Sequence, residues 1–158
     1  MPEKRFMEEI MAPPSYVFPM VRDLRTANMW ALNQWGQLLF PTDAAFMNVG
    51  QEVILNLFKL KETIILYIRR IVENQTMEFE IFGGFLEGDI QWIFHERPYG
   101  TLFEISATVL PPVSFSKKMK WNMNGKKSFE GFFTDMLLKV KSAVEGSLAS
   151  QANPVPTY

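Results

Sequence analysis

Hydrophobic residues recur with two different periods along this chain. Between residues 51 and 110, every second position is apolar in successive short segments, a pattern that predicts β-strands. The expected strands cover 51–58, 63–73, 76–82, 87–97 and 101–110. Turns such as Asn74-Gln75 and Pro98-Tyr99-Gly100 separate them, so we expect an antiparallel meander.

The clearest helical pattern runs from Ser128 to Gly146. Its apolar residues repeat every three or four positions and form one broad stripe, which requires a buried partner. Ser128 suits the N-cap, and Gly146 suits the position just past the last turn. The predicted sheet is the available partner. The stripe consists of Phe129, Phe132, Phe133, Met136, Leu137, Val140, Ala143 and Val144.

The rest of the chain predicts shorter elements around this pair. They are a first strand over 4–11, short helices over 15–23 and 24–35, a loop over 38–48 and a lysine-rich linker over 116–127. Residues 149–158 are polar, contain two prolines and predict a flexible tail. The chain is therefore expected to be a single α+β domain over 1–148, with two short helices after the first strand, followed by the tail.

Composition narrows the possible functions. The chain has 158 residues, 47% of them hydrophobic, enough for one domain with a sizeable core. Its net charge of −1 gives no reason to expect a nucleic-acid partner. Without cysteine there are no disulfides or thiolates, which fits a cytoplasmic location. The single His95 rules out a multi-histidine metal site, so we expect no metal or cofactor. No apolar run approaches the ~20 residues of a transmembrane helix.

Several short motifs then form a familiar order. Ala12-Pro13 ends the first strand, Val17-Phe18 and Asp23 lie on the first helix, and Trp30 follows. This order resembles the opening of START/polyketide-cyclase-like (SRPBCC) domains. The turn from Arg97 to Thr101 and the helix from Ser128 to Gly146 resemble the later hairpin and closing helix of the family, whereas residues 38–48 depart from its pattern.

The resemblance implies a helix-grip fold, in which a strongly curved antiparallel sheet of about seven strands wraps around a long C-terminal helix. It also implies an apolar cavity between the sheet and the helix. Relatives bind lipids, sterols, polyketides, quinones or plant hormones, and a minority catalyse cyclisation or dehydration. Because a fold does not fix a function, the site residues must carry the argument.

The side chains that point toward the implied cavity are the candidate ligand-binding residues. They are Trp30, Leu55, Phe79, Trp92, Phe103, Phe132, Phe133, Met136 and Val140. The same residues are equally suited to filling a core, because aromatic side chains bury large areas in either role. Tyr67 and Arg69 share one face of the strand 63–73. If that face points inward, they would orient a ligand carbonyl or carboxylate, since Arg binds carboxylates bidentately.

Three further groups have candidate roles on the surface. His95 is out of phase with Trp92 and Phe94, so we expect it on the outer face rather than acting as a general base. Asp23 at the end of the first helix is expected to cap or pair locally. Lys117, Lys118, Lys120 and Trp121 in the linker suggest contact with anionic lipid or a protein partner. The alternative is a solvated loop with Trp121 tucked under the helix.

Three functions remain open at this stage. The first is non-catalytic binding of a small hydrophobic ligand, such as a lipid, an isoprenoid, a polyketide or a pigment-like molecule. The second is an accessory subunit that uses the fold as a docking scaffold in a larger complex. The third is a cyclase or dehydratase, which needs an acid or base on the cavity wall. The sequence offers no convincing one, so we expect a protein that is not an enzyme.

Overall fold

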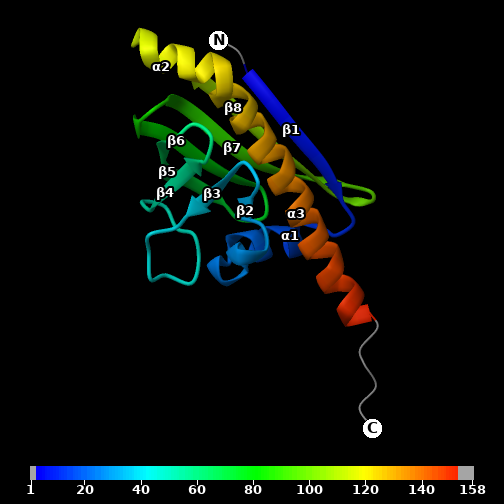
Figure 1. The fold of residues 1–158 in the computed structure, drawn as a ribbon. Coiled ribbons are helices and arrows are strands. Elements are labelled where there is room, and N and C mark those ends of the chain that lie inside the picture. The colour runs from blue at the N-terminus through cyan, green and yellow to red at the C-terminus, as the bar shows by residue number, and fades with distance from the viewer. Residues whose placement is uncertain (1–2, 153–158) are drawn as a thin grey trace.

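An antiparallel sheet of eight strands curls around one long helix in the computed structural model, which describes residues 3–152 apart from the side chains at 83, 84, 151 and 152 (Figure 1). The strand order across the sheet is β1-β8-β7-β6-β5-β4-β3-β2. The strands are β1 Glu3–Ile10, β2 Leu32–Asn33, β3 Gly36–Leu39, β4 Glu52–Leu57, β5 Glu62–Val72, β6 Thr76–Gly84, β7 Glu87–Arg97 and β8 Gly100–Leu110. This is a helix-grip arrangement of the α+β class, with eight strands rather than about seven.

The helical segments precede and follow the meander. They are α1 Pro14–Arg22, the 3₁₀-helix η1 Leu24–Met29, α2 Phe115–Lys120, the π-helix η2 Trp121–Gly125 and α3 Lys126–Ala152. None of the helices between residues 3 and 152 is long and apolar enough to cross a membrane.

The predicted meander is confirmed, because β4 to β8 match the five expected strands to within a few residues. Burial alternates along each strand, so one face of the sheet is apolar and lies against the helix. The buried inward residues are Val53, Leu55, Leu57, Ile64, Leu66, Ile68, Met77, Phe79, Ile81, Ile90, Trp92, Phe94, Phe103, Ile105, Ala107 and Val109.

The predicted second helix over 24–35 is wrong in its second half. It ends at Met29, and the chain then forms the small hairpin β2–β3, which extends the sheet beyond β4. Asn33 explains the change of direction. Its side-chain oxygen accepts from the Trp35 amide (2.9 Å), while its side-chain nitrogen donates to the Phe132 carbonyl (3.1 Å). These bonds favour a turn over a helix. Leu38, which lies in the predicted loop, is buried in β3.

The predicted linker over 116–127 is also wrong, because α2, η2 and α3 follow one another without a break. Ser114 caps the start by accepting from the Lys117 amide (3.5 Å), and Ser128 is instead buried within the helix. Lysine and methionine are good helix formers, so the polar composition of this stretch is compatible with an exposed helix. The helix also passes Gly146 and enters the stretch expected as a tail; residues 153–158 lie outside the described part of the chain.

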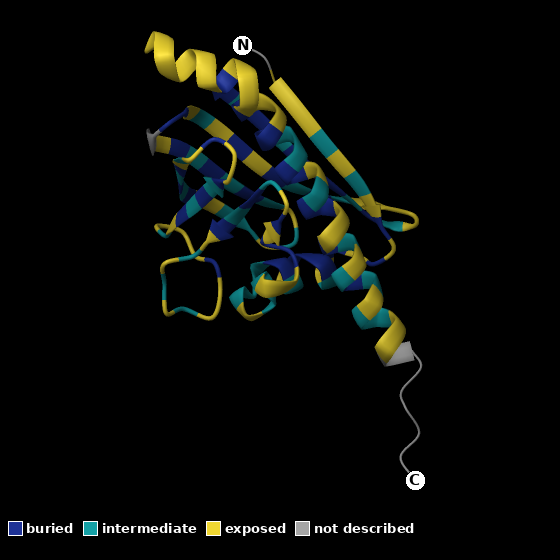
Figure 2. Cartoon of the chain, in the orientation of Figure 1, coloured by how far each residue is buried: buried dark blue, intermediate teal, exposed yellow. Residues whose placement is uncertain are grey.

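The helical stripe faces the sheet as predicted. Phe129, Phe132, Phe133, Met136, Leu137, Val140 and Val144 are all buried, whereas Ala143 is only partly so. Figure 2 shows this stripe as the dark blue side of α3 beneath an exposed outer side. The stripe reaches the edge strand too, where the rings of Phe6 and Phe133 stack with centroids 6.1 Å apart.

Two motifs that carried the family resemblance meet in space. Ile10 at the end of β1 pairs with Thr101 at the start of β8, and the Thr101 hydroxyl donates to the Ala12 carbonyl (2.6 Å). Gly100 leaves room for this contact, since a Cβ there would lie 2.5 Å from the Ile10 oxygen. The Ala-Pro turn and the β7–β8 hairpin therefore brace each other at one end of the sheet.

Candidate functional site

The predicted ligand-binding residues gather where the inner face of the sheet meets α3. Trp92 lies at the centre of the aromatic cluster, with its ring centroid 4.7 Å from Phe79 and 6.1 Å from both Trp30 and Phe103. Phe94 stacks on Phe103 at 4.4 Å. Close contacts of this kind show that these aromatic side chains pack against one another.

All nine inward candidates are buried. They are Trp30, Leu55, Phe79, Trp92 and Phe103 from the sheet and its flanking loop, and Phe132, Phe133, Met136 and Val140 from α3. Their inward position was predicted correctly, and their role in binding a ligand stays a prediction.

Trp92 carries a feature that the hydrophobic pattern does not indicate. Its indole nitrogen Nε1 is buried and has no hydrogen-bond partner among the described residues, although the side chain is only 1% exposed. Leaving a buried donor without an acceptor costs about 1–3 kcal/mol. The inner face therefore contains one polar group whose bonding capacity is unused.

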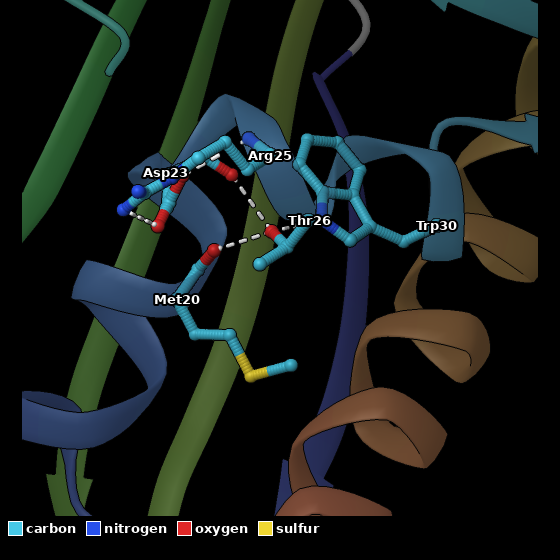
Figure 3. Close-up of polar contacts among 5 residues, drawn as sticks. All are labelled: Met20, Asp23, Arg25, Thr26 and Trp30. Carbon is cyan, nitrogen blue, oxygen red and sulfur yellow. Dashed lines mark hydrogen bonds and ion pairs between the residues drawn. The ribbon is translucent and has the colours of Figure 1, made fainter. Parts of the chain in front are cut away.

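Trp30, by contrast, is held by a complete polar network, shown in Figure 3. Its Nε1 donates to the Thr26 hydroxyl (3.3 Å), and that hydroxyl shares its proton between the carbonyls of Met20 (2.6 Å) and Asp23 (2.8 Å). Asp23 in turn caps η1 by accepting from the Arg25 amide (3.0 Å). The hydrogen bond from the Arg25 side chain holds the pKa of Asp23 below its ordinary value. The expected local capping role of Asp23 is confirmed.

Replacing Thr26 by valine is expected to destabilise the protein by about 1–3 kcal/mol, because two carbonyls and the Trp30 indole lose their shared partner while the side-chain volume is kept. Urea unfolding followed by tryptophan fluorescence measures the change. Thr63→Val on the exposed face of β5 is the matched control and is expected to stay within about 0.5 kcal/mol of the wild type. Equal effects of the two substitutions would show that the network does not stabilise η1.

Tyr67 and Arg69 do not lie in this site. Ile64, Leu66 and Ile68 occupy the inner face of β5, so the residues between them point to the outer face. Arg69 is exposed and forms an ion pair with Glu80 (3.2 Å), and the Tyr67 ring packs against Phe82 (5.8 Å). The inward orientation on which their candidacy depended is therefore wrong. Both faces of this strand are apolar in its first half, which left the phase ambiguous.

The outer face also holds His95, as predicted. Its Nε2 lies 2.7 Å from a carboxylate oxygen of Glu104, which is buried to 8% exposure. Arg5 approaches the same carboxylate at 3.6 Å. Within the described residues, no group of three or more His, Cys, Asp or Glu side chains is placed to hold a metal ion. Arg5 and His95 thus contact one carboxylate on the side of the sheet away from α3, the first as an ion pair and the second as a hydrogen bond.

One end of the interface between sheet and helix is less tightly filled. A cavity of about 70 Å³ there is bordered by Val109, Pro111, Trp121 and Phe129, and by the polar residues Lys4, Asn122, Lys126 and Glu130. Trp121 is buried, so the interpretation of this residue as a membrane or partner contact is wrong, and the alternative prediction that it is tucked under the helix is correct.

The π-helix directs Trp121 inward: its ring packs on Gly125, where a Cβ would lie 2.5 Å from the indole. Short π-helical turns are frequent at functional sites. No pattern in the sequence indicates this turn.

Comparison with known proteins supports the fold and nothing finer. No model of a known family and no curated protein matches the chain. Among solved structures, TTHA0849 from Thermus thermophilus is similar with a TM-score of 0.70 at 16% identity, over 92% of this chain and 99% of that one. The Aha1 dimer from Colwellia psychrerythraea gives 0.60 at 14% identity, over 92% and 97%. DynU16, from the dynemicin biosynthetic locus, gives 0.61 at 16% identity, over 92% of this chain and 48% of that one.

Proposed function

We propose that this protein binds a small hydrophobic molecule between the inner face of the sheet and α3, and that the molecule carries a hydrogen-bond acceptor. The observation that supports this is the unpartnered Nε1 of Trp92, buried among Phe79, Trp30 and Phe103. A carbonyl or ether oxygen at this position would satisfy the indole. The surrounding rings would bind the apolar remainder of the ligand.

Burial of apolar surface would supply most of the affinity, at about 25 cal/mol per Å² before the costs of binding are subtracted. The cavity of about 70 Å³ lies at the Trp121 end of the interface and is not lined by Trp92, Phe79 or Phe103, so it does not supply the space for such a molecule. Side chains of the interface therefore have to move apart when it binds. Met136 on α3 faces the sheet and is suited to this, because its unbranched side chain adapts to irregular shapes.

A matched pair of aromatic probes tests the proposal. Benzophenone carries a carbonyl acceptor, and diphenylmethane has the same two rings without it. We expect benzophenone to bind more tightly and to shift the indole N–H signal of Trp92 in two-dimensional nitrogen–proton NMR spectra. Trp92→Phe identifies that signal by its loss and is expected to weaken benzophenone binding by about two- to tenfold, the equivalent of one hydrogen bond.

Two controls make the result specific. Trp92→Phe should leave the affinity for diphenylmethane nearly unchanged, since that molecule cannot accept the bond. Trp35→Phe replaces a half-buried indole that packs against Gly131 and Lys59, and it should leave benzophenone binding unchanged. Two results would contradict the proposal. One is that benzophenone binds without shifting the Trp92 signal, and the other is that neither probe binds.

A catalytic function finds no support in the same interface. The buried carboxylate among the described residues is Glu104, and it lies with His95 on the outer face of the sheet. A cyclase or dehydratase requires such a group beside the ligand. The proposal is therefore one of binding without chemical conversion.

A further inference from the structure

The start of the long helix exposes an apolar stripe that nothing in the described chain covers. Phe115 is 78% exposed, Met119 46% and Met123 70%, and their four-residue spacing places them along one side. Trp121, two residues after Met119, lies on the opposite side of the helix and is buried. Figure 2 shows α2 as an almost wholly exposed element at the end of the helix that lies beyond the sheet. The stripe therefore points away from the body of the molecule.

The stretch of sequence that carries this stripe is strongly basic. Lys117, Lys118, Lys120, Lys126 and Lys127 lie within residues 113–128, which contain no acidic residue. Since the whole chain has 16 basic and 17 acidic residues, the remainder carries 11 and 17, a net charge of −6. All five lysines are exposed. One end of an otherwise acidic molecule is thus a cationic surface with an apolar centre, which we call the α2 patch.

We propose that the α2 patch docks on an anionic lipid surface, with the apolar stripe among the outer acyl chains and the lysines at the headgroups. An amphipathic helix with lysines beside an exposed apolar side is suited to lie in the plane of a membrane interface. Each lysine near an anionic membrane strengthens binding about fivefold. Lysine is depleted in protein–protein interfaces, so its density here favours lipid over a protein partner.

The α2 patch lies close to one end of the interface between the sheet and α3. A groove of about 430 Å³ next to it is lined by Leu110, Pro111, Val113 and Lys117, together with the β6–β7 connection. Pro111 also borders the small cavity beside Trp121. Docking would bring this end of the sheet–helix interface to the lipid surface. The docking proposal does not rest on the proposed ligand, because it depends only on exposed residues of α2, η2 and the first turn of α3.

Co-sedimentation with lipid vesicles tests the proposal. We expect the protein to bind vesicles of equimolar phosphatidylserine and phosphatidylcholine, to bind pure phosphatidylcholine weakly, and to dissociate as salt is raised. The double variant Lys117→Gln/Lys118→Gln is expected to bind the anionic vesicles about 30-fold more weakly, which is the product of two lysine contributions. Lys120 is kept, because it also pairs with Glu62 (3.3 Å).

The apolar half of the patch has its own variant. Phe115→Ser/Met119→Ser is expected to weaken binding by at least about tenfold, since an inserted phenylalanine and methionine are lost. Matched controls are Lys59→Gln/Arg97→Gln for charge and Met11→Ser/Met29→Ser for exposed apolar residues elsewhere. These four positions lie outside the patch, so the controls should bind like the wild type.

Three results would overturn the proposal. They are no binding to the anionic vesicles, equal binding to both kinds of vesicle, and controls that lose as much binding as the patch variants. In the first case the stripe would be left as a face for a protein partner. None of these results depends on the benzophenone titration, so docking and ligand binding can fail separately.

Discussion

Gly88→Ala is expected to destabilise the protein by at least about 3 kcal/mol. Gly88 has a φ of +145°, which residues with a Cβ rarely adopt, and a Cβ there would overlap the Thr108 carbonyl oxygen. It is paired with Ile81 on one side and Val109 on the other. Because both neighbouring strands hold β7 in place, neither the glycine nor the carbonyl can move without breaking the ladder. A fall in melting temperature of roughly 6–12 °C is expected.

Gly146→Ala provides a control of the opposite sign. Gly146 lies within α3, and apart from the local helix backbone and its two neighbours in the chain no atom lies within 4 Å of the position that its Cβ would occupy. Alanine in a helix interior is favoured over glycine, so this substitution is expected to stabilise the protein by up to about 1 kcal/mol. Thermal unfolding of both variants gives the comparison. A Gly88→Ala protein as stable as the wild type would show that the β7–β8 pairing at this position is not as described.

Phe132→Ala is expected to cost about 3–5 kcal/mol. The Phe132 ring is fully buried on the sheet side of α3 and packs edge-on against Phe133 at 5.1 Å. Removing it leaves a void in the middle of the interface between helix and sheet, and the rigid strands on the far side limit collapse. Urea unfolding measures this loss of stability. The unfolding free energy is taken to fall with urea concentration at the same rate in both proteins.

The Phe132→Ala void also distinguishes a tightly packed interface from a loosely packed one. Benzene is expected to raise the melting temperature of this variant by more than that of the wild type, since a dry apolar void binds such a molecule. Leu138→Ala, on the exposed side of the same helix, is the control and should change stability by about 0.5 kcal/mol or less. A loss below about 1 kcal/mol for Phe132→Ala would indicate that the interface already has free space.

Much of the sheet was predictable because several of its strands alternate regularly between apolar and polar residues. In β6 and β8 every second residue is apolar, so the inward residues follow from the sequence alone. In β5 both faces are apolar around Ile65 and Tyr67, and the sequence does not show which face is inside. Neighbouring strands decide it, because Leu66 pairs opposite Val53 and Ile81, which are themselves buried.

The errors at the two helical regions have a different origin. The helix predicted over 24–35 ends at Met29 because the chain turns at Asn33, whose side chain donates to the main-chain carbonyl of Phe132, a residue far away in the sequence. The lysine-rich stretch, predicted as a linker, is helical although α2 buries none of its side chains. Both segments depend on tertiary contacts or on helix propensity rather than on hydrophobic period.

The candidate site was predictable only in part. The buried aromatic residues follow from the strand period, but the free indole N–H of Trp92 depends on how neighbouring rings are oriented. The exposed stripe likewise depends on which side of α2 faces the body. The pattern of apolar and polar residues along the sequence indicates which side chains are buried. It does not indicate which of their polar atoms lack a hydrogen-bond partner.

The π-helical turn from Trp121 to Gly125 has a consequence for how chains with this architecture diverge. Successive side chains of an α-helix point in directions about 100° apart. One residue gained or lost in this turn therefore rotates the helical residues before it, those of α2, by that angle relative to α3. Loss of a single residue here would leave Phe129 and the rest of α3 in place, while Phe115 and Met119 would turn to a different side. At this point in the chain, a change of length is equivalent to a rotation. Two proteins with nearly the same composition would then present different surfaces.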